Sequence, residues 1–583
     1  MNRLIKHSSP LSSYILSFFS TLGILYLNNR VHSTPIAVSL FFYIGFVCFY
    51  EKYNCPLKAG STESKVLAFI FSFLLLLDSP CFENLHPTFK SIFLFLLTFS
   101  GLFFLFFTLI DFWVRRTKRI QFSIIASRND HSVRKIRHIS FTLLWIVYFL
   151  YFLNQYPGSL SCDTPNQLSQ ALGHTDFENA NPFINTLILT VCVKIGQLLR
   201  NNVNTGIAIY TVVQFTFAAS VFSYTVSTIF KHNFPKAVVI LAQVFYNLIP
   251  YNIVYATGMW KDTFFSLLFL ATLTNLFDLF MSAQIFPQIA LQPRCRLFIL
   301  VFLTSLARNS GWSSLLIVGL IMLLFSIRTD EKISRTLSLI TLTGTFAALI
   351  TISSIYPLFG ITEKGNITTG ISIPLQQIAR VVAESGDYSE FEKEQINSLI
   401  EIEKIPELYD ERISDPLKRV VNTNFLEQNI TEYALLWIKL GLKNPKIYLD
   451  AYIQLTRYYW SLDSQTWIWD VRIFENNFGV TRNAKLFPRF DLTILLSKFY
   501  KIPKMHVTAT SAFTLWIALS GLCVSHARKN AFGSILFVPI IMIFIGLMLT
   551  SPAALFRYTY GASVCIPLML CFPFCDEIKS SKL

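Results

Sequence analysis

The 583-residue sequence has little charge: 14% of its residues are Asp, Glu, Lys or Arg, whereas a soluble domain has about 25%. Hydrophobic residues make up 53% of the chain, and phenylalanine alone contributes 56 residues. This composition argues against a water-soluble globular protein. It predicts an all-α polytopic membrane protein, in which each span needs about 20 mainly apolar residues.

Paired cysteines are also missing, because the ten cysteines are scattered and no CxxC pair occurs. Such spacing argues against a cysteine metal site or a disulfide scaffold, and leaves at most one bridge, between Cys81 and Cys162. The net charge of +15 does not indicate nucleic acid as a partner. The Lys and Arg residues lie in short loops between apolar runs, as the positive-inside rule expects, and no nucleic-acid-binding module is present.

The apolar runs predict about fourteen transmembrane helices, with both ends of the chain in the cytoplasm. An N-terminal four-helix extension (1–110) precedes a basic cytoplasmic loop (111–138) that holds eight Lys and Arg residues. A membrane core (139–358) follows, and three more helices lie in 509–583. The predicted spans are 11–27, 35–50, 66–77, 91–110, 139–153, 205–229, 237–256, 262–280, 297–309, 311–326, 337–358, 509–526, 531–549 and 552–573.

The run 183–199 is predicted to lie on the outer leaflet rather than to cross it. It has about 17 residues and contains Asn185, Lys194 and Gln197. With this assignment, the Lys and Arg of the later loops fall on the cytoplasmic side. A similar question concerns 297–309 and 311–326, because a single interrupted helix there would reverse the orientation of everything that follows.

Residues 361–508 differ from the rest, since they hold 19 of the 34 acidic residues. The segment is long enough to form a domain, which we predict to be mainly helical and extracytoplasmic. Its three clustered tryptophans, Trp460, Trp467 and Trp469, are more typical of a domain core or an interfacial belt than of a sugar-binding platform.

A polar, turn-rich outer loop (154–204) follows the apolar run 139–153. Pro157 and Gly158 end the helix, and Asp163 comes five residues after the glycine. An acid near the membrane interface is a candidate catalytic group, although a helix cap is the plainer interpretation. Asp176 and Glu178 lie further along the loop and are more typical of solvated charges.

Other ionisable residues are predicted at the same depth as Asp163, and a protein poor in charge makes such convergence a site hypothesis. They are Lys261 and Asp262, Arg308 and Asn309, and Arg557 and Tyr558. A carboxylate beside several cations suits transfer from a lipid-phosphate donor, because the acid can accept a proton while the cations bind the phosphate. A glycine-rich phosphate loop is missing, and a lipid-linked donor would not need one.

Plainer roles exist for each of these residues. Lys261 and Asp262 could form an interfacial ion pair. Arg308 could extend to lipid headgroups, and Arg557 could anchor the last helix at lipid phosphates.

The pattern Pro157-Gly158-x4-Asp163, followed by Asn181-Pro182-Phe183, resembles the GT-C superfamily of membrane glycosyltransferases. Three further stretches resemble it as well: Pro250 to Lys261-Asp262, Ala307-Arg308-Asn309-Ser310-Gly311, and Phe556-Arg557-Tyr558. More closely, residues 139–573 are similar to a family of uncharacterised multi-pass membrane proteins of Gram-positive bacteria. That similarity includes Ile373–Arg380 and Asn444–Tyr448.

The resemblance implies a GT-C-like fold in the cell membrane, with a polyprenyl-phosphate sugar donor and a cell-envelope glycan or protein acceptor on the outer face. Asp163 would be the general base, and Arg557, Arg308 and Lys261 would bind the donor phosphate. Supporting roles would fall to Asp262, Asn309, Tyr558, Asp176 and Glu178. Asn181 stands where the superfamily often has histidine, and Cys162 where a second acid is usual, so no ligand set for a divalent metal ion is predicted.

Two other functions remain open at this point. A polysaccharide polymerase or ligase would share the chemistry and differ in its acceptor. A transporter or flippase of lipid-linked glycans would be expected to contain internal repeats, which the sequence does not show.

Overall fold

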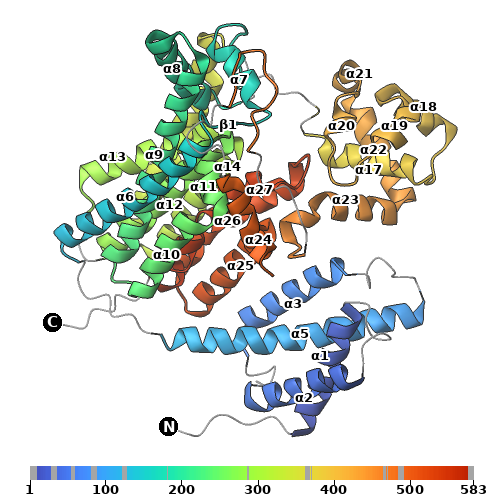
Figure 1. The fold of residues 1–583 in the computed structure, drawn as a ribbon. Helices are drawn as coiled ribbons and strands as arrows, with labels where there is room; N and C mark the ends of the chain where they lie inside the picture. The colour runs from blue at the N-terminus through green and yellow to red at the C-terminus, as the bar shows by residue number, and fades with distance from the viewer. Residues whose placement is uncertain are drawn as a thin grey trace. The chain divides into compact units, whose positions relative to one another are not determined.

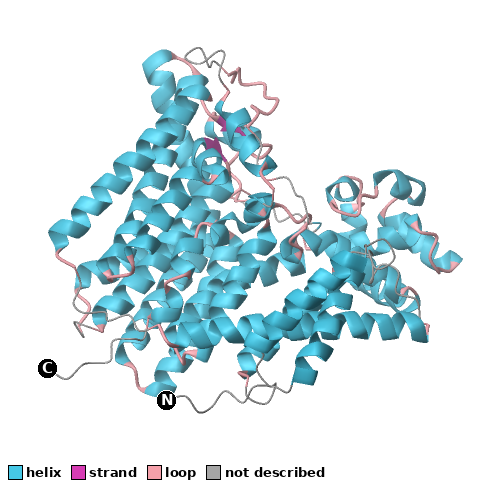
Figure 2. Cartoon of the chain, turned by 60° about the horizontal axis from the view of Figure 1, so that its bottom comes forward, coloured by secondary structure: helices cyan, strands magenta, loops and turns pink. Residues whose placement is uncertain are grey.

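The computed structural model describes residues 10–27, 36–53, 60–79, 88–120, 128–179, 181–284, 288–361, 368, 370–463, 468, 471–482, 491–503 and 505–575. These residues are almost all helical, and they contain one pair of very short strands (Figure 2). The chain divides into two compact units. One comprises residues 1–122 with 519–534, and the other comprises 123–518 with 535–583.

The smaller unit contains the four predicted N-terminal helices: α1 (Pro10–Leu27), α2 (Ile36–Tyr53), α3 (Thr62–Leu77) and α5 (Phe89–Lys118). Helices α1 and α5 meet at small residues: Gly101 approaches the backbone of Phe19, and the Ser20 hydroxyl donates to the Gly101 carbonyl at 3.1 Å. Close backbone contact at glycine and serine is the usual way for helices to associate in a membrane.

The larger unit is built around a bundle of apolar helices (Figure 1). Its members are α6 (Asp130–Asn154), α9 (Val203–Lys231), α10 (Lys236–Leu248), α11 (Pro250–Thr257), α12 (Lys261–Ala283), α13 (Leu291–Ala307), α14 (Asn309–Thr329) and α15 (Lys332–Ile350). A π-helix η1 (Thr351–Ile355) and α16 (Tyr356–Leu358) continue α15. Near the C-terminus it contains α25 (Ser511–Ala527) up to residue 518 and α26 (Ala531–Thr550) from residue 535, followed by α27 (Phe556–Ser563), α28 (Ile566–Met569) and η5 (Phe572–Phe574).

The central helix of this bundle is α12. Within an apolar stretch of 18 residues of this helix, 94% of the residues are buried, and the helix contacts α9, α13 and α27. A helix that is apolar on every side belongs inside a bundle rather than against lipid. Its first two residues, Lys261 and Asp262, are candidate site residues, so the best-buried helix of the unit also supports the site.

Nine helices among the described residues are long and apolar enough to cross a membrane, and a tenth is obtained if α10 and α11 count as one span bent by 54°. The protein is therefore a multi-pass membrane protein of the all-α class. The prediction of fourteen spans is not confirmed. The last predicted span, 552–573, is interrupted into α27, α28 and η5, and α1 and α25 are shorter apolar helices.

Two predicted boundaries differ from the structure. The segment 111–138 was predicted as a loop, but α5 continues to Lys118 and α6 begins at Asp130. The extra helical turns carry most of the basic residues of this segment. A helix can continue beyond its apolar part when the long basic side chains reach water or lipid headgroups.

The pair α13 and α14 consists of two helices rather than one interrupted helix. A Cβ placed on Gly311 would lie 2.5 Å from the backbone oxygen of Thr304, so the chain reverses direction between these residues. In a continuous helix, residues seven apart would be separated by about 10 Å.

Helix α8 (Phe183–Arg200) is long and apolar enough to pass the test for a span, so composition does not settle the prediction that it stays outside the membrane. It contacts α9 at Gly206 and Tyr210, just before Thr211, whose hydroxyl donates to the Pro157 carbonyl at 2.9 Å. Because α6 has already ended at Asn154, α8 packs on a part of α9 that extends past that end (Figure 1).

Within 361–508, a helical domain has its own core. Its elements are α17 (Ser372–Ala383), α18 (Glu390–Leu399), η3 (Ile402–Lys404), α19 (Ile405–Leu408), α20 (Asp415–Lys418), α21 (Thr423–Gln428), α22 (Ile430–Lys443) and α23 (Pro445–Trp460). The rest of 361–508 does not belong to that core: Ile473 pairs with Leu160 beside the candidate site, and α24 (Leu492–Lys501) and η4 (Met505–Ala509) lead into α25. Trp460 ends α23, whereas Trp467 and Trp469 lie outside the described residues.

Candidate functional site

Two very short parallel strands bring the outer loop and the start of α12 together. Strand β1 (Ser159–Leu160) pairs with β2 (Gly258–Met259) in the register Ser159–Gly258 and Leu160–Met259. Asp163 follows β1 by three residues, and Lys261 follows β2 by two. Because parallel strands end at the same edge, this pairing places the carboxylate and the ammonium group side by side.

Buried polar groups hold this arrangement in place. The Gln214 amide on α9 donates to the carbonyls of Tyr255, Ala256 and Gly258, at 3.0, 3.1 and 2.6 Å. Tyr255 and Ala256 lie in the last turn of α11 and Gly258 lies in β2, so a single amide joins the end of the helix to the strand. The Thr164 hydroxyl donates to the Met259 carbonyl at 2.9 Å and so ties α7 (Thr164–Ala171) to β2.

A glycine is required where α6 turns into β1. Gly158 has a φ of +131°, and a Cβ there would lie 2.5 Å from the Thr211 hydroxyl. Only glycine adopts this conformation without strain. The Pro-Gly turn predicted from the sequence therefore fixes the path of the chain to Asp163.

Asp163 lies between two cations. Its Oδ2 is 3.0 Å from Arg557 Nη1 and 3.4 Å from Lys261 Nζ, and no hydrogen bond among the described residues uses its Oδ1. Burial by itself would raise the pKa of the Asp163 carboxyl, but the charges of Lys261 and Arg557 outweigh burial and bring that pKa below its usual value. Asp163 stands at the N-terminus of α7, yet its side chain makes no capping hydrogen bond.

A second carboxylate has a cation of its own. Asp262 is 2% exposed, and its Oδ1 accepts from Arg308 Nη1 at 2.5 Å. The ring of Tyr558 connects the two pairs, because the guanidinium carbons of Arg308 and Arg557 lie 5.2 and 4.8 Å from its centre. The Tyr558 hydroxyl also accepts from Arg557 Nη2 at 2.9 Å.

The five charged side chains of the site come from four parts of the chain: Asp163 from the outer loop, Lys261 and Asp262 from α12, Arg308 from the start of α14, and Arg557 from the start of α27. If all five are ionised, they leave one uncompensated positive charge. The convergence predicted from the sequence is therefore present in the structure.

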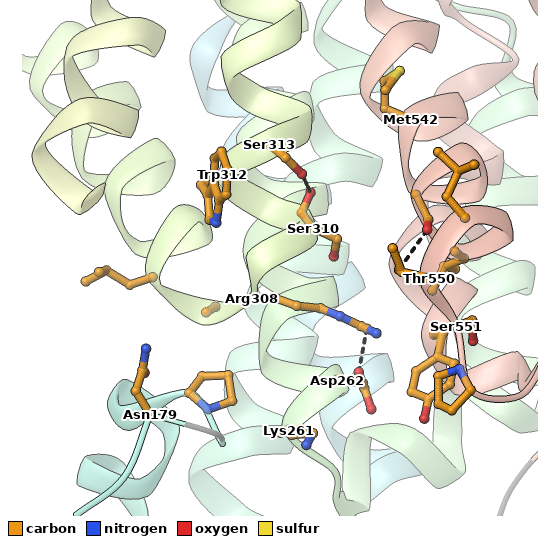
Figure 3. Close-up of a pocket in the computed structure, with 18 of the residues that line it drawn as sticks. Asn179, Lys261, Asp262, Arg308, Ser310, Trp312, Ser313, Met542, Thr550 and Ser551 are labelled. Atoms are coloured by element: carbon orange, nitrogen blue, oxygen red, sulfur yellow. Dashed lines mark hydrogen bonds and ion pairs between the residues drawn. The ribbon is translucent and has the colours of Figure 1, made fainter. Parts of the chain in front are cut away.

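A cavity of about 530 Å³ opens beside these pairs (Figure 3). Its polar end is formed by Lys261, Asp262 and Arg308, with Asn179 nearby and with Thr550 and Ser551 across from them. Its other walls are largely apolar and include Leu306, Trp312, Ile352, Met542 and Leu549. Asp163 and Arg557 do not line the cavity, but they contact Lys261 and Tyr558, which do.

Three predicted supporting residues are not part of these contacts. Asp176 is exposed on the loop after α7, and Glu178 lies in the same loop, where its backbone N–H donates to Gln170 Oε1 at 3.4 Å. Neither lines the cavity. Asn309 begins α14, and its side chain lies outside the described part of the structure.

Sequence reasoning missed several residues of the site. Asn181 was considered only as part of a turn, but its Oδ1 accepts from Lys261 Nζ at 2.7 Å. The ring of Trp260 lies 5.2 Å from the Arg557 guanidinium carbon. Gln214 carried a usable signal, because a single amide within an apolar span needs a hydrogen-bonding partner in the protein.

The residues around Asp163 do not fit a divalent metal ion. The described part of the chain contains no group of three or more His, Cys, Asp or Glu side chains placed to bind one. More directly, Lys261 and Arg557 already surround the carboxylate with positive charge, which would repel a metal cation.

No curated protein and no solved structure matches the chain. A model described as a family of unknown function matches residues 171–582, a range that includes every candidate site residue except Asp163. The protein therefore belongs to the DUF6020 family.

Proposed function

We propose that the protein is a membrane glycosyltransferase of the GT-C type. It moves a sugar from a polyprenyl-phosphate-linked donor to a cell-envelope acceptor on the outer face of the membrane. The observation that carries this proposal is the arrangement of one carboxylate, Asp163, with Arg557 and Lys261 beside a cavity that is charged at one end and largely apolar elsewhere.

The cavity suits a lipid-linked ligand better than a soluble one. Its volume falls in the range of about 300–1,000 Å³ that is typical of ligand sites. An anionic phosphate would lie at Lys261 and Arg308, where bidentate contact to a guanidinium is favourable. The apolar walls from α13, η1 and α26 would contact the first isoprene units.

The chemistry is a direct displacement at the anomeric carbon. The acceptor hydroxyl forms a bond to that carbon while the bond to the phosphate oxygen breaks, and polyprenyl phosphate leaves with the electron pair. The hydroxyl proton passes to Asp163, whose Oδ1 is not engaged by the described residues. Arg557, Arg308 and Lys261 stabilise the charge that develops on the leaving phosphate.

The resting site is unsuited to proton abstraction, because two cations on Oδ2 weaken Asp163 as a base. An arriving phosphate competes for these cations. As Lys261 and Arg557 turn toward the phosphate, the carboxylate loses their stabilisation and regains basicity. Donor binding would thus activate the base.

The proposal is tested with purified protein in lipid nanodiscs and a polyprenyl-phosphate sugar donor. Asp163→Asn retains size and hydrogen bonding but cannot accept a proton. We expect it to bind the donor and to lose transfer by about 10²-fold or more, the usual contribution of a general base. Asp176→Asn, an exposed acid of the same loop, is the matched control and should retain normal transfer.

Near-normal transfer by Asp163→Asn would reject Asp163 as the base and move attention to Asp262. No transfer by the unmodified protein from any lipid-phosphate sugar, together with movement of the intact donor across the bilayer, would instead favour the flippase. A polymerase or ligase would pass the same test with a polymeric acceptor.

A further inference from the structure

A second charged cluster lies at the far end of α12. Asp278 on α12 is buried, and its Oδ1 contacts Lys231 Nζ at 2.7 Å and His232 Nε2 at 2.8 Å. Arg296 on α13 approaches the other oxygen, with Nη2 3.8 Å from Oδ2. Sixteen residues separate Asp278 from Asp262, which places the cluster about 24 Å along the helix axis from the candidate site.

Two arginines from different helices share one aromatic ring in this cluster. The guanidinium carbons of Arg137, on α6, and Arg296 lie 5.2 and 5.4 Å from the ring centre of Tyr224, on α9. The Tyr224 hydroxyl donates to Asp278 Oδ2 at 3.4 Å. With its amide turned so that the oxygen faces Arg296, Asn275 accepts from Nε and Nη2 at 2.8 Å each. Asn275 therefore holds Arg296, whereas the Tyr224 ring is the only partner of Arg137 among the described residues.

The cluster has more positive charge than its own carboxylate can balance. Lys231 and Arg296 share one acid, Asp278, while Arg137 lies over the Tyr224 ring and takes part in no ion pair among the described residues. Two positive charges therefore remain. Lys231 and Arg296 are 27% and 46% exposed, so the surplus faces outward rather than into the bundle.

We propose that this cluster is a specific binding site for the phosphodiester headgroup of an anionic phospholipid, in the leaflet opposite the candidate site. Helix α6 packs on α9, α9 on α12 and α12 on α13 (Figure 1), so these neighbouring helices hold the cations around Tyr224 and Asp278. Excess cations at the end of an apolar bundle need an anion or water, and a lipid phosphate is the anion present at that depth. The proposal is independent of the reaction at Asp163.

The test compares two double variants that lose the same charge from the same two helices. Arg137→Gln with Arg296→Gln removes the cations around Tyr224. Lys135→Gln with Arg294→Gln removes two exposed neighbouring cations, of which Lys135 lies on the opposite side of α6. Each purified protein in detergent is titrated with phosphatidylglycerol, with phosphatidylcholine and with inorganic phosphate, and binding is followed by native mass spectrometry and thermal unfolding.

We expect the unmodified protein and the Lys135/Arg294 variant to bind phosphatidylglycerol equally, and to bind it in preference to phosphatidylcholine. The Arg137/Arg296 variant should bind it at least about tenfold more weakly, because two charge-assisted contacts are lost. Equal loss in both double variants, or no preference for phosphatidylglycerol, would overturn the proposal. Stabilisation by inorganic phosphate that matches that by phosphatidylglycerol would also overturn it, since the site would then bind a free anion.

Discussion

At the scale of single residues, the site depends on how one carboxylate shares its cations. Asp163 holds Lys261 and Arg557 through one oxygen, and Asp262 holds Arg308. An acid in this position is ionised at every physiological pH but is a weak base, so its reactivity depends on what else binds the cations.

This arrangement predicts two different acid limits for the reaction. In the free protein the pKa of Asp163 lies below the usual value of about 3.9, so activity carried by the ionised form is lost only as pH falls through that lowered pKa. When the donor phosphate shares Lys261 and Arg557, the pKa of Asp163 should rise toward its usual value. Because kcat/KM reports the free protein and kcat reports the complex, we expect the acid limb of kcat/KM at lower pH than that of kcat.

Steady-state rates measured between pH 3 and 8 with increasing donor check this, with Asp176→Asn as the control for general acid damage. Acid limbs at the same pH in both parameters would show that the donor does not take over the cations.

Part of the site could be predicted from the residues themselves. In a chain with so few charges, an acid and several cations at helix ends indicate a shared location, and Asp163, Lys261 and Arg557 do meet. The pairing of Arg308 with Asp262, and the role of Asn181, could not be predicted. These contacts depend on a two-residue strand pair and on a sharp reversal between two helices. Neither of these structural features has a periodic sequence pattern.

At the scale of elements, the reversal between α13 and α14 places Arg308. The backbone of Arg308 is extended, with a φ of −170°. Helix α13 ends immediately before this residue and α14 begins immediately after it. The turn is so tight that Gly311, in the first turn of α14, has no room for a side chain beside Thr304.

We therefore predict that Gly311→Ala destabilises the protein by about 1–3 kcal/mol, the usual cost of overpacking, since its Cβ would lie 2.5 Å from the Thr304 carbonyl oxygen. The same change should weaken donor binding, because Arg308 is displaced from Asp262. Thermal unfolding in detergent and donor titration measure the two effects. Gly45→Ala on α2 is the matched control, with no atom within 4 Å of the added Cβ, and should be neutral or slightly stabilising.

Helix α8 has two faces with different partners. One face packs on α9, where Gly196 and Gly206 allow close approach. The opposite face is apolar and exposed, with Leu187, Val191 and Leu198 at 45%, 51% and 86% exposure. An apolar face that none of the described residues covers is typical of a helix that lies in the membrane interface.

We predict that α8 does not cross the bilayer, so that Asn202 and Lys236 lie on opposite sides of the membrane. Cysteines introduced at these two exposed positions are treated with a membrane-impermeant thiol reagent in intact cells, with the unsubstituted protein giving the background. Asn202→Cys should react from outside and Lys236→Cys only after permeabilisation. The reverse pattern would show that α8 spans.

Helix positions in general followed from apolar runs, and the four N-terminal helices, α6, α9 and α12 fall close to the predicted ranges. Helix ends did not, because α5 and α6 extend into 111–138 on charged residues. The interruption of 552–573 was also missed. Inside a bundle, neighbouring helices can satisfy the backbone groups that a break exposes, so an apolar run does not guarantee a continuous helix.

At the scale of the whole larger unit, the helical domain is attached to the segment that leads to Arg557. The Ser414 backbone N–H donates to the Pro552 carbonyl at 2.8 Å, and the Tyr459 hydroxyl donates to Ser551 Oγ at 2.7 Å. Since Ser551 and Pro552 line the cavity, the domain adjoins the site without contributing a charged group to it.

We predict that this domain selects the acceptor and takes no part in the chemical step. A chimera that carries residues 372–458 of a relative, with Ser414 retained, should transfer sugar to a different acceptor while hydrolysing the donor in water at an unchanged rate. Both rates are measured on purified protein with one donor and a panel of acceptors. An unchanged acceptor range, together with lost hydrolysis, would assign the domain to catalysis.

The two charged ends of α12 have a consequence for the surrounding lipid. Asp262 and Asp278 are about 24 Å apart along the helix, whereas the hydrocarbon layer of a typical bilayer is about 30 Å thick. In a membrane of long acyl chains, one end lies below the headgroups unless the bilayer thins around the protein. In a membrane of shorter chains, both ends reach the headgroup region together. Acyl-chain length, through hydrophobic mismatch, should therefore affect how readily the polar end of the cavity meets its ligand even when headgroup composition is held constant.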